Sequence, residues 1–279
     1  MFLDNTFYQA INELKAARAG TELMGPLLHS LIRTTRPENV LEVGMGYTTP
    51  FILEALTRNQ ADFLVELEQL KNKNRDYLAK IEGEETKKLK QGAKPLVLMD
   101  EWIAKEPSLA SPEFYTTTYE PMLHAIDNFS SPDSFANHTQ DVLRIMNLDN
   151  YLKIYQGDFR NFKDKVTKNK KYLDFIWFDC GNAEDYKDFV EEYWDAVNPN
   201  CGYLLLHSTL NRYSYHSVMT YFKSKIGTSE FSDIEVLSLL EPHKLTQGSV
   251  TMIKKIKKEI PKFPIENAYS LLDSIKKVV

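Results

Sequence analysis

Short apolar runs alternate with amphipathic stretches along most of the chain. The runs that we expect to form strands are residues 39–43, 121–127, 151–159, 173–181 and 202–211. Between them, residues 50–56 and 131–148 have apolar positions at helical spacing, the second with Val142, Ile145 and Met146 facing inward. Strands that are apolar almost throughout and alternate with helices indicate a parallel sheet covered on both faces.

Three segments add to this alternation. Residues 1–38 are expected to be helical, because leucines recur there at helical spacing. Residues 57–120 separate two core elements by far more than the usual connection of about 4–6 residues, so they predict an insertion with its own structure. Residues 231–242 and 247–256 predict an antiparallel pair of strands at a sheet edge.

Together these patterns predict one α/β domain over residues 1–279. Its expected fold is Rossmann-like, with a doubly wound, mostly parallel sheet and an antiparallel hairpin at the C-terminal edge. The aromatic run at residues 114–119 lies inside the insertion. We interpret it either as a lid over a pocket or as a structural loop wedged on the core, and we favour the lid because long loops in compact domains tend to carry function.

Polar and acidic residues stand where the predicted strands end. In open α/β sheets, ligands bind outside the carboxyl ends of the strands. In chain order those ends carry Glu42 with Gly44 and Gly46, Asp127, Asp158 with Phe159, Asp179, and His207 with Ser208. This set of strand-end side chains is the main functional signal in the sequence.

The first strand end suits a ligand that carries an amino-acid tail and no phosphates. Glycine at positions 44 and 46 lets the backbone pass close to a ligand where a Cβ would clash. Glu42 can reach a ligand ammonium group, directly or through water. A dinucleotide site would need the pattern G-x-G-x-x-G, but here Tyr47, Thr48 and Thr49 follow Gly46, so we expect no pyrophosphate cradle.

The second and third strand ends suit the nucleoside part of the same ligand. Asp127 can accept hydrogen bonds from two vicinal ribose hydroxyls. Asp158 can accept from an exocyclic adenine amine, while Phe159 packs near the ring. The ordinary alternative for both aspartates is a helix N-cap or a loop carboxylate.

Several of these segments resemble one enzyme family. NVLEVGMGY, HAIDN and YQGDF resemble the first motif, the second-strand acid and the adenine-side motif of class I S-adenosylmethionine (SAM)-dependent methyltransferases. GPLLHSLIRTTRPENVLEVG and DFIWFDCGN resemble the subgroup around catechol-type small-molecule O-methyltransferases. The resemblance covers residues 24–56 and 120–255. It implies SAM as cofactor and in-line methyl transfer to a small polar acceptor, a hydroxyl or an amine.

The chain departs from that family at two positions. Thr48 stands where the first motif often has a further glycine. The metal-dependent catechol enzymes have an acid after the fourth strand, matched by Asp179, and an Asp-Asn pair after the fifth, where this chain has His207-Ser208. Those two residues and Asn211 could still surround a metal, but Mg²⁺ prefers carboxylate oxygens, so we expect none.

Asp179 and His207 are the candidates for taking the proton of the acceptor. Asp179 is also expected to contact the cofactor, although a strand-end aspartate can equally cap the next helix. For His207 the alternative is a buried histidine bonded to a neighbouring strand. Tyr47 and the aromatic residues at 114–119 could cover a sulfonium cation by cation–π attraction.

Two other functions remain open on the same site. Azetidine-2-carboxylic acid synthases are methyltransferase-like proteins in which the amine of SAM displaces methylthioadenosine and closes a four-membered ring. The cofactor signature does not distinguish them from methyltransferases, but the product does: methylthioadenosine instead of S-adenosylhomocysteine (SAH). A binding subunit without chemistry would take up SAM and turn nothing over.

Charge and cysteine content limit the kinds of partner and site that we expect. Acidic residues outnumber basic ones, 39 to 34, and the net charge is −5, which argues against a strongly basic nucleic-acid face. The lysines between Lys254 and Lys258 are interpreted as a solvated face. Cys180 and Cys201 are too few for a disulfide scaffold or a zinc site.

No signal-peptide pattern is found at the N-terminus, and no apolar run approaches the ~18 residues that a membrane span needs. We therefore expect a cytoplasmic protein that acts on a small molecule, with no nucleic-acid or membrane partner. The sequence leaves the oligomeric state open, with a homodimer as one option.

Overall fold

The computed structural model describes residues 3–16, 20–80, 102–108, 110–129, 134–210, 216–245, 247–256 and 274–279. The chain forms two compact units. Unit 1 comprises Met1–Arg58 and Pro121–Lys258, and unit 2 comprises Asn59–Glu120 and Glu259–Val279. Unit 2 therefore includes the C-terminal segment as well as most of residues 57–120. The view of the whole chain as a single domain with a lid stays a prediction.

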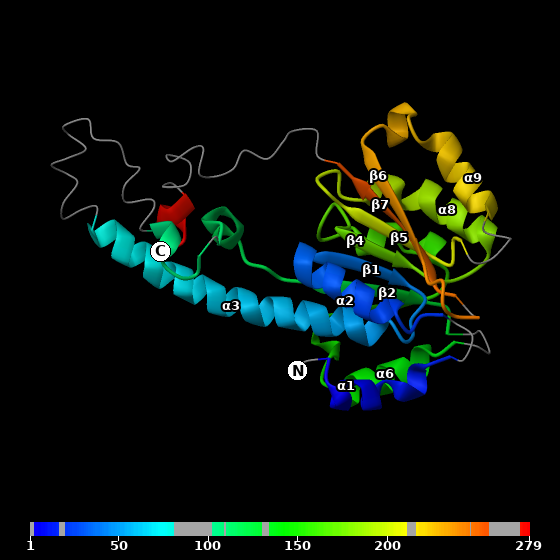
Figure 1. Ribbon diagram of the computed structural model, residues 1–279, viewed down its shortest axis with the longest axis horizontal. Helices are drawn as coiled ribbons and strands as arrows, with labels where there is room; N and C mark the ends of the chain where they lie inside the picture. Colours follow the sequence, from blue (N-terminus) through cyan, green and yellow to red (C-terminus); the bar gives the residue numbers. More distant parts are fainter. Residues whose placement is uncertain are drawn as a thin grey trace. The chain divides into compact units, whose positions relative to one another are not determined.

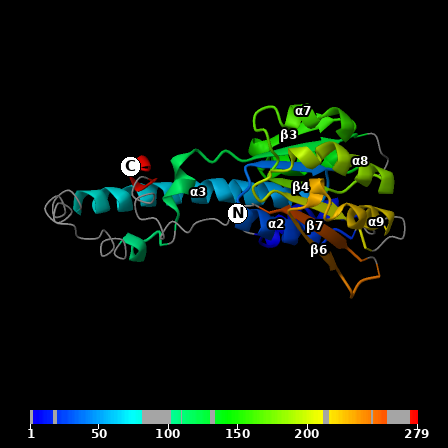
Figure 2. The same cartoon turned by 90° about the horizontal axis from the view of Figure 1, so that it is seen from above.

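Unit 1 is built on a seven-stranded sheet with the order β3-β2-β1-β4-β5-β7-β6 (Figures 1 and 2). The parallel strands are β1 (Asn39–Val43), β2 (Met122–Asp127), β3 (Leu152–Gln156), β4 (Phe175–Phe178) and β5 (Tyr203–His207). β7 (Ser249–Lys255) pairs antiparallel with β5 and with β6 (Ile234–Leu240). The predicted Rossmann-like fold and its antiparallel edge hairpin are confirmed. The strand order reverses between β1 and β4, where such folds bind their ligands.

Helices cover both faces of the sheet (Figure 1). On one face α2 (Met24–Thr35), the start of α3 (Thr49–Lys80) and α6 (Ala136–Ile145) share a buried apolar cluster with alternate residues of the strands. On the other face α8 (Ala183–Tyr193) and α9 (His216–Lys225) do the same with the remaining strand positions. The central parallel strands β1, β4 and β5 are therefore buried on both sides, as the sequence pattern predicts, whereas the edge strand β3 is not.

Shorter helices and turns precede or connect the larger elements of the sheet and its helices. They are α1 (Asn5–Ala10), α7 (Lys163–Val166) and the 3₁₀ turns Asn12–Leu14, Asp149–Tyr151, Phe159–Asn161, Trp194–Ala196 and Ser229–Phe231. Phe7 of α1 packs edge-on against Phe51 of α3, with ring centroids 4.9 Å apart. A Cβ on Gly25 of α2 would lie 2.4 Å from the Phe51 ring, so glycine permits α2 and α3 to pack closely.

Two helix predictions were wrong in detail. The helix expected at residues 50–56 is the start of α3, which continues to Lys80 because no glycine or proline interrupts residues 51–80. Ile145 is 79% exposed although Val142 and Met146 are buried. The buried face of α6 is formed by Ala136, Thr139, Val142, Leu143 and Met146, and Ile145 lies outside it. Residues 131–133 of that predicted helix lie outside the described residues.

Unit 2 has its own aromatic core. Its buried members are Phe63, Leu70, Tyr77, Trp102, Tyr115, Tyr119, Ile275 and Val278. Tyr115 stacks on Phe63 with centroids 5.2 Å apart, and its hydroxyl donates to Glu66 Oε2 at 2.6 Å. The run at 114–119 thus contributes to the core of unit 2, through the 3₁₀ turn Pro112–Thr116. Its role as a lid stays a prediction.

A lysine is buried in this core. Lys73 Nζ donates to the Pro107 carbonyl at 2.8 Å and lies 3.8 Å from the centroid of the Trp102 ring. Burial lowers the pKa of Lys73 to about 8, because the apolar surroundings disfavour the ammonium form.

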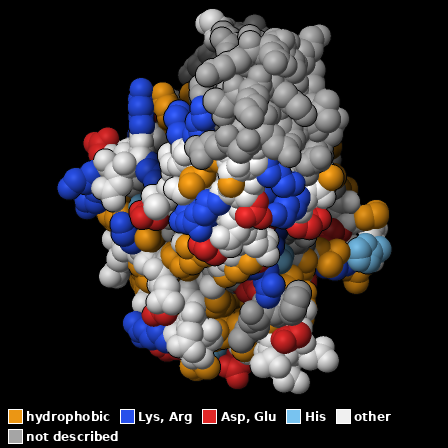
Figure 3. All heavy atoms as spheres, turned by 90° about the vertical axis from the view of Figure 1, so that its left-hand side faces the viewer, with side chains coloured by type: hydrophobic (Ala, Val, Ile, Leu, Met, Phe, Trp, Pro, Cys, Tyr) orange, Lys and Arg blue, Asp and Glu red, His pale blue; other side chains and the backbone are white. Residues whose placement is uncertain are grey.

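The surface of the described residues gives two further observations. None of their helices is long and apolar enough to span a membrane. On the face drawn in Figure 3, basic and acidic side chains are interspersed.

Candidate functional site

The two glycines after β1 do different things. Gly44 has φ +96°, and a Cβ there would lie 2.5 Å from the Asp179 carbonyl oxygen. Its missing side chain therefore lets the turn after β1 pack on the end of β4, rather than on a ligand. Around Gly46, apart from its two chain neighbours, no atom of the described residues lies within 4 Å of the Cβ position. Only Gly46 faces the open space that the predicted approach of a ligand requires.

Glu42 is fully buried at the end of β1. Its Oε1 accepts a hydrogen bond from Thr48 Oγ1 at 2.7 Å, and its buried Oε2 has no hydrogen-bond partner among the described residues. Burial, opposed by bonds from Thr48 and Thr49, raises the pKa of Glu42 to about 8. Direct contact with a ligand ammonium is thus closed in this arrangement, and the carboxyl is protonated at neutral pH.

Asp127 connects the turns that follow β1 and β2. Its Oδ2 accepts from the Met45 amide at 2.9 Å, and its Oδ1 accepts from the Phe129 amide at 2.8 Å and from Ser134 Oγ at 3.0 Å. A carboxylate has about four acceptor sites, so one remains on Oδ2. Asp127 as folded has room for one ribose hydroxyl rather than the two expected from the sequence.

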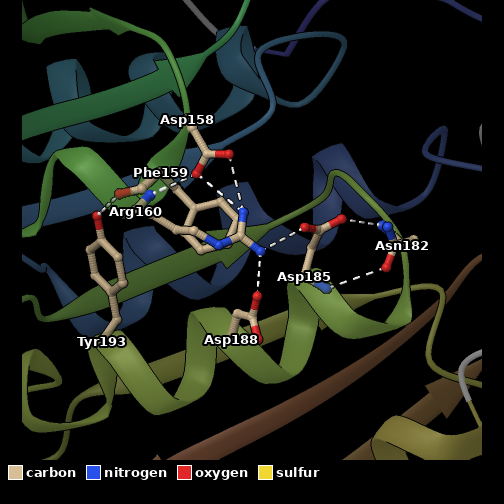
Figure 4. Close-up of polar contacts among 7 residues, drawn as sticks. All are labelled: Asp158, Phe159, Arg160, Asn182, Asp185, Asp188 and Tyr193. Atoms are coloured by element: carbon tan, nitrogen blue, oxygen red, sulfur yellow. Dashed lines mark hydrogen bonds and ion pairs between the residues drawn. The ribbon is translucent and has the colours of Figure 1, made fainter.

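Asp158 lies in a cluster of charges centred on Arg160 (Figure 4). The Arg160 guanidinium contacts both oxygens of Asp158 at 3.2 and 3.1 Å, Asp185 at 2.8 Å and Asp188 at 2.5 Å. The carboxylates of α8, Asp188 first, raise the pKa of Arg160. Asp158 also caps the turn that follows β3 by accepting from the Arg160 amide at 2.9 Å. It is therefore both an N-cap and an ion-pair partner.

Phe159 is buried under this cluster. Its ring packs edge-on against Phe178 and Phe189, at centroid distances of 5.5 and 5.4 Å, and Arg160 lies over it at 4.4 Å. Little of the ring remains for an adenine to contact, so this packing does not favour the predicted place of Phe159 beside the base. Sequence reasoning missed Arg160. Two signals were available. Arg160 lies two residues after a strand-end aspartate, and the later helix α8 has acidic residues in its first turns.

Asp179 and His207 meet across neighbouring strands. His207 Nδ1 lies 2.6 Å from Asp179 Oδ1, and Ser208 Oγ lies 3.3 Å from the same nitrogen. The side chain of Asp179 is 24% exposed and that of His207 only 3%. Asp179 thus presents the accessible surface of the pair, and His207 lies behind it. Tyr186 of α8 donates to the His207 carbonyl at 2.9 Å and holds the end of β5.

Tyr47 belongs to the core rather than to an open wall. Its ring lies 5.2 Å from that of Phe51, and it is buried. Burial raises the pKa of Tyr47 to about 12, with Tyr8 and Glu22 adding to the shift. Little of the ring can cover a sulfonium in this arrangement.

The structure offers limited material for a metal site. Among the described residues, no group of three or more His, Cys, Asp or Glu side chains could hold a metal ion. Asn211, which the sequence suggested as a third ligand, lies outside them. Cys180 is partly buried beside Asp179, and burial raises the pKa of its thiol, which disfavours the thiolate that metals bind.

A cavity of about 700 Å³ lies at the opposite end of the sheet. It is lined by residues that precede β1, β4 and β5, among them Glu38, Asp174 and Asn200. Asp174 accepts from the Glu38 and Asn39 amides at 3.0 and 2.9 Å. Ligands of this fold bind at the carboxyl ends of the strands, so we do not assign this polar hollow to the candidate site.

Comparisons with known proteins agree with the fold. No protein-family model matches the chain, and no curated protein does. Among solved structures, the O-methyltransferase TomG of Streptomyces achromogenes, in complex with SAM, is similar with a TM-score of 0.55 at 13% identity, over 91% of each chain. An O-methyltransferase of Bacillus cereus, in complex with SAH, has a TM-score of 0.54 at 11% identity, again over 91% of each chain.

A Klebsiella pneumoniae protein provisionally described as an O-methyltransferase has a TM-score of 0.56 at 10% identity, over 91% of each chain. At such low identity the likeness establishes a shared fold. The chain thus has the Rossmann-like fold found in O-methyltransferases.

Proposed function

We propose that this protein is a SAM-dependent methyltransferase that acts on the hydroxyl or amine of a small molecule. The observation that carries the proposal is the set of carboxylates at one edge of the sheet. Glu42 and Asp127 lie at the carboxyl ends of β1 and β2, and Asp179 follows β4; Gly46, in the turn after β1, faces open space. No phosphate cradle accompanies them. The fold that this chain shares with SAM-bound O-methyltransferases supports the same function.

The residues fit such a cofactor in charge and in space. Asp127 and Asp179 act electrostatically on Glu42 and both raise its pKa, so the three carboxyls lie close together. The two aspartates favour a cation beside them, whereas the protonated Glu42 adds no charge. The space at Gly46 admits a ligand beside the first turn. Asp127 retains one acceptor site for a ribose hydroxyl, and Asp158 is assigned to the adenine side. When bound, SAM supplies a methyl group activated by its positive sulfur.

The chain itself must then orient the acceptor and remove its proton. We assign proton removal to Asp179, because it is the more exposed member of the pair. His207 is assigned a positioning role: its Nδ1–H donates to Asp179 Oδ1 and fixes the direction of the carboxylate. Ser208 and Tyr186 hold His207 in turn.

The test is incubation of the protein with SAM, alone and with a panel of phenols, alcohols and amines, followed by mass spectrometry. Formation of SAH together with a methylated acceptor supports the proposal. Methylthioadenosine formed without any acceptor would replace it by the cyclisation to azetidine-2-carboxylic acid. Uptake of SAM without turnover on any acceptor indicates a binding subunit, and no uptake by calorimetry rejects the site. Glu184→Gln removes an exposed carboxylate of α8 and is the matched control for variants of the site carboxyls.

We also propose that the protein works in the cytoplasm on a small molecule, without nucleic acid. The interspersed charges in Figure 3 and the net charge of −5 support this view. A homodimer is the assembly that we propose.

A further inference from the structure

The outer strand of the sheet has apolar side chains on both of its faces. In β6, Val236, Leu237, Leu239 and Leu240 are between 38% and 50% exposed. Successive residues of a strand point to opposite faces, so Leu237 and Leu239 lie on one face and Val236 and Leu240 on the other. A helix laid on the sheet would cover one face only. A neighbouring strand covers both, because its own side chains flank the strand on each side.

The two edges of the sheet differ in how they are protected. β3, at one edge, has five residues with Lys153 and Gln156 exposed. Short edge strands with an exposed lysine resist pairing with another chain. β6, at the other edge, has seven residues and neither lysine nor proline. Its one charge, Glu235, is paired with Lys254 of β7 at 3.1 Å. Nothing within β6 therefore opposes the addition of a further strand.

We propose that β6 pairs antiparallel with β6 of a second copy of this chain, which joins two sheets across a two-fold axis (Figure 2 shows β6 at the rim of the sheet). With Leu237 on the axis, Val236 faces Ser238 of the partner strand and Glu235 faces its Leu239. No carboxylate within the strand meets another, whereas an axis at Glu235 would oppose two of them. Beyond the strand, Lys244 neutralises Glu241 at 3.2 Å.

The second copy is the occupant because the strand complements itself. An isologous contact requires the same surface on both partners. A strand that is apolar on both faces, and whose only charge is already paired, meets this requirement with its own sequence. The proposal gives the homodimer proposed above its interface, and it does not depend on the proposed methyltransferase activity.

The first test is the mass of the full chain in solution, by size exclusion with light scattering. We expect twice the chain mass of 32.3 kDa. Leu237→Lys places a charge on the two-fold axis and is expected to give a monomer. Ile145→Lys places the same charge at an exposed position of α6 and is expected to leave the dimer intact. A monomeric wild-type chain, or a dimer that survives Leu237→Lys, overturns the proposal.

The second test holds even if the lysine variant fails to fold. Facing residues of antiparallel strands have Cα atoms about 4.5–5.5 Å apart, within the range that a disulfide bridges. In a Cys201→Ser background, Leu237→Cys is expected to form a covalent dimer under mild oxidation, and Ile145→Cys is not. Equal cross-linking of both variants, or none with Leu237→Cys, rules out this pairing.

Discussion

The buried carboxyl of Glu42 should make the stability of this protein depend on pH. Its pKa is raised to about 8 by burial, and the corresponding value in an unfolded chain is about 4.3. The folded state thus holds a proton that the unfolded state releases. The stabilising effect of this proton is complete below the unfolded pKa and is lost as pH rises through the folded pKa.

The magnitude follows from the two values. Each pH unit between them removes about 1.4 kcal/mol from the free energy of unfolding. Between pH 5 and pH 8 the loss from Glu42 is therefore about 4 kcal/mol, a large fraction of the about 5–15 kcal/mol by which a typical domain is stable. Glu42→Gln keeps an oxygen that can accept from Thr48 but cannot ionise. In wild type, the loss of unfolding free energy that Glu42 causes stays constant above pH 8.

Denaturant unfolding of wild type and Glu42→Gln at several pH values between 5 and 8.5 tests this reasoning. We expect the difference in unfolding free energy to move in favour of the variant as pH rises. Thr48→Val removes a bond that lowers the pKa of Glu42 and should extend the slope to higher pH. Glu184→Gln reports the effect of net charge alone. A flat difference, or one that favours wild type at high pH, would refute a buried proton on Glu42.

Three other predictions follow from single sites. Gly44→Ala should destabilise the protein by about 1–3 kcal/mol, because of its positive φ and the contact with Asp179, whereas Gly46→Ala should fold normally and weaken SAM binding; calorimetry and thermal melts distinguish the two. Asp179→Asn should reduce methyl transfer about 10²–10⁴-fold and weaken SAM binding through the lost charge, while His207→Gln should lower methyl transfer less and shift its pH profile; equal activity in both variants and wild type contradicts the assignment. The lowered pKa of Lys73 should make wild type gain stability relative to Lys73→Met as pH rises from 8 to 10.5, because the unfolded chain binds more protons there, and a constant difference in unfolding free energy would argue against it.

The sheet could be predicted because its strands appear in the sequence as short apolar runs. The run 39–43 is mostly apolar, and an acid and two glycines mark its end, so the strand and the turn after it follow from the pattern; its place in a ligand site stays a prediction. The antiparallel pair at the sheet edge was equally visible and is confirmed as β6 and β7. These features depend on neighbours in the sequence, which is the kind of information that periodicity carries.

The remaining details depend on neighbours in space. The pairing of Phe178 with Leu206 brings Asp179 and His207 together, but only once β4 and β5 are known to be adjacent. The requirement for glycine at position 44 comes from the Asp179 carbonyl, far away in the chain. Phe159 follows its strand in a 3₁₀ turn, where alternation no longer says which way a side chain points.

Three of the strand-end acids already have hydrogen-bond partners within the protein. Asp127 accepts hydrogen bonds from the turns after β1 and β2, Asp158 accepts one from its own turn, and Glu42 is held by Thr48, so these groups are fixed before any ligand arrives. Of these groups, the aspartates are the ones that favour a positive charge, because Glu42 holds a proton. Under the proposed function, the charge on sulfur distinguishes SAM from its neutral-sulfur product SAH. A site with this electrostatic character would thus hold the methyl donor and release the spent cofactor.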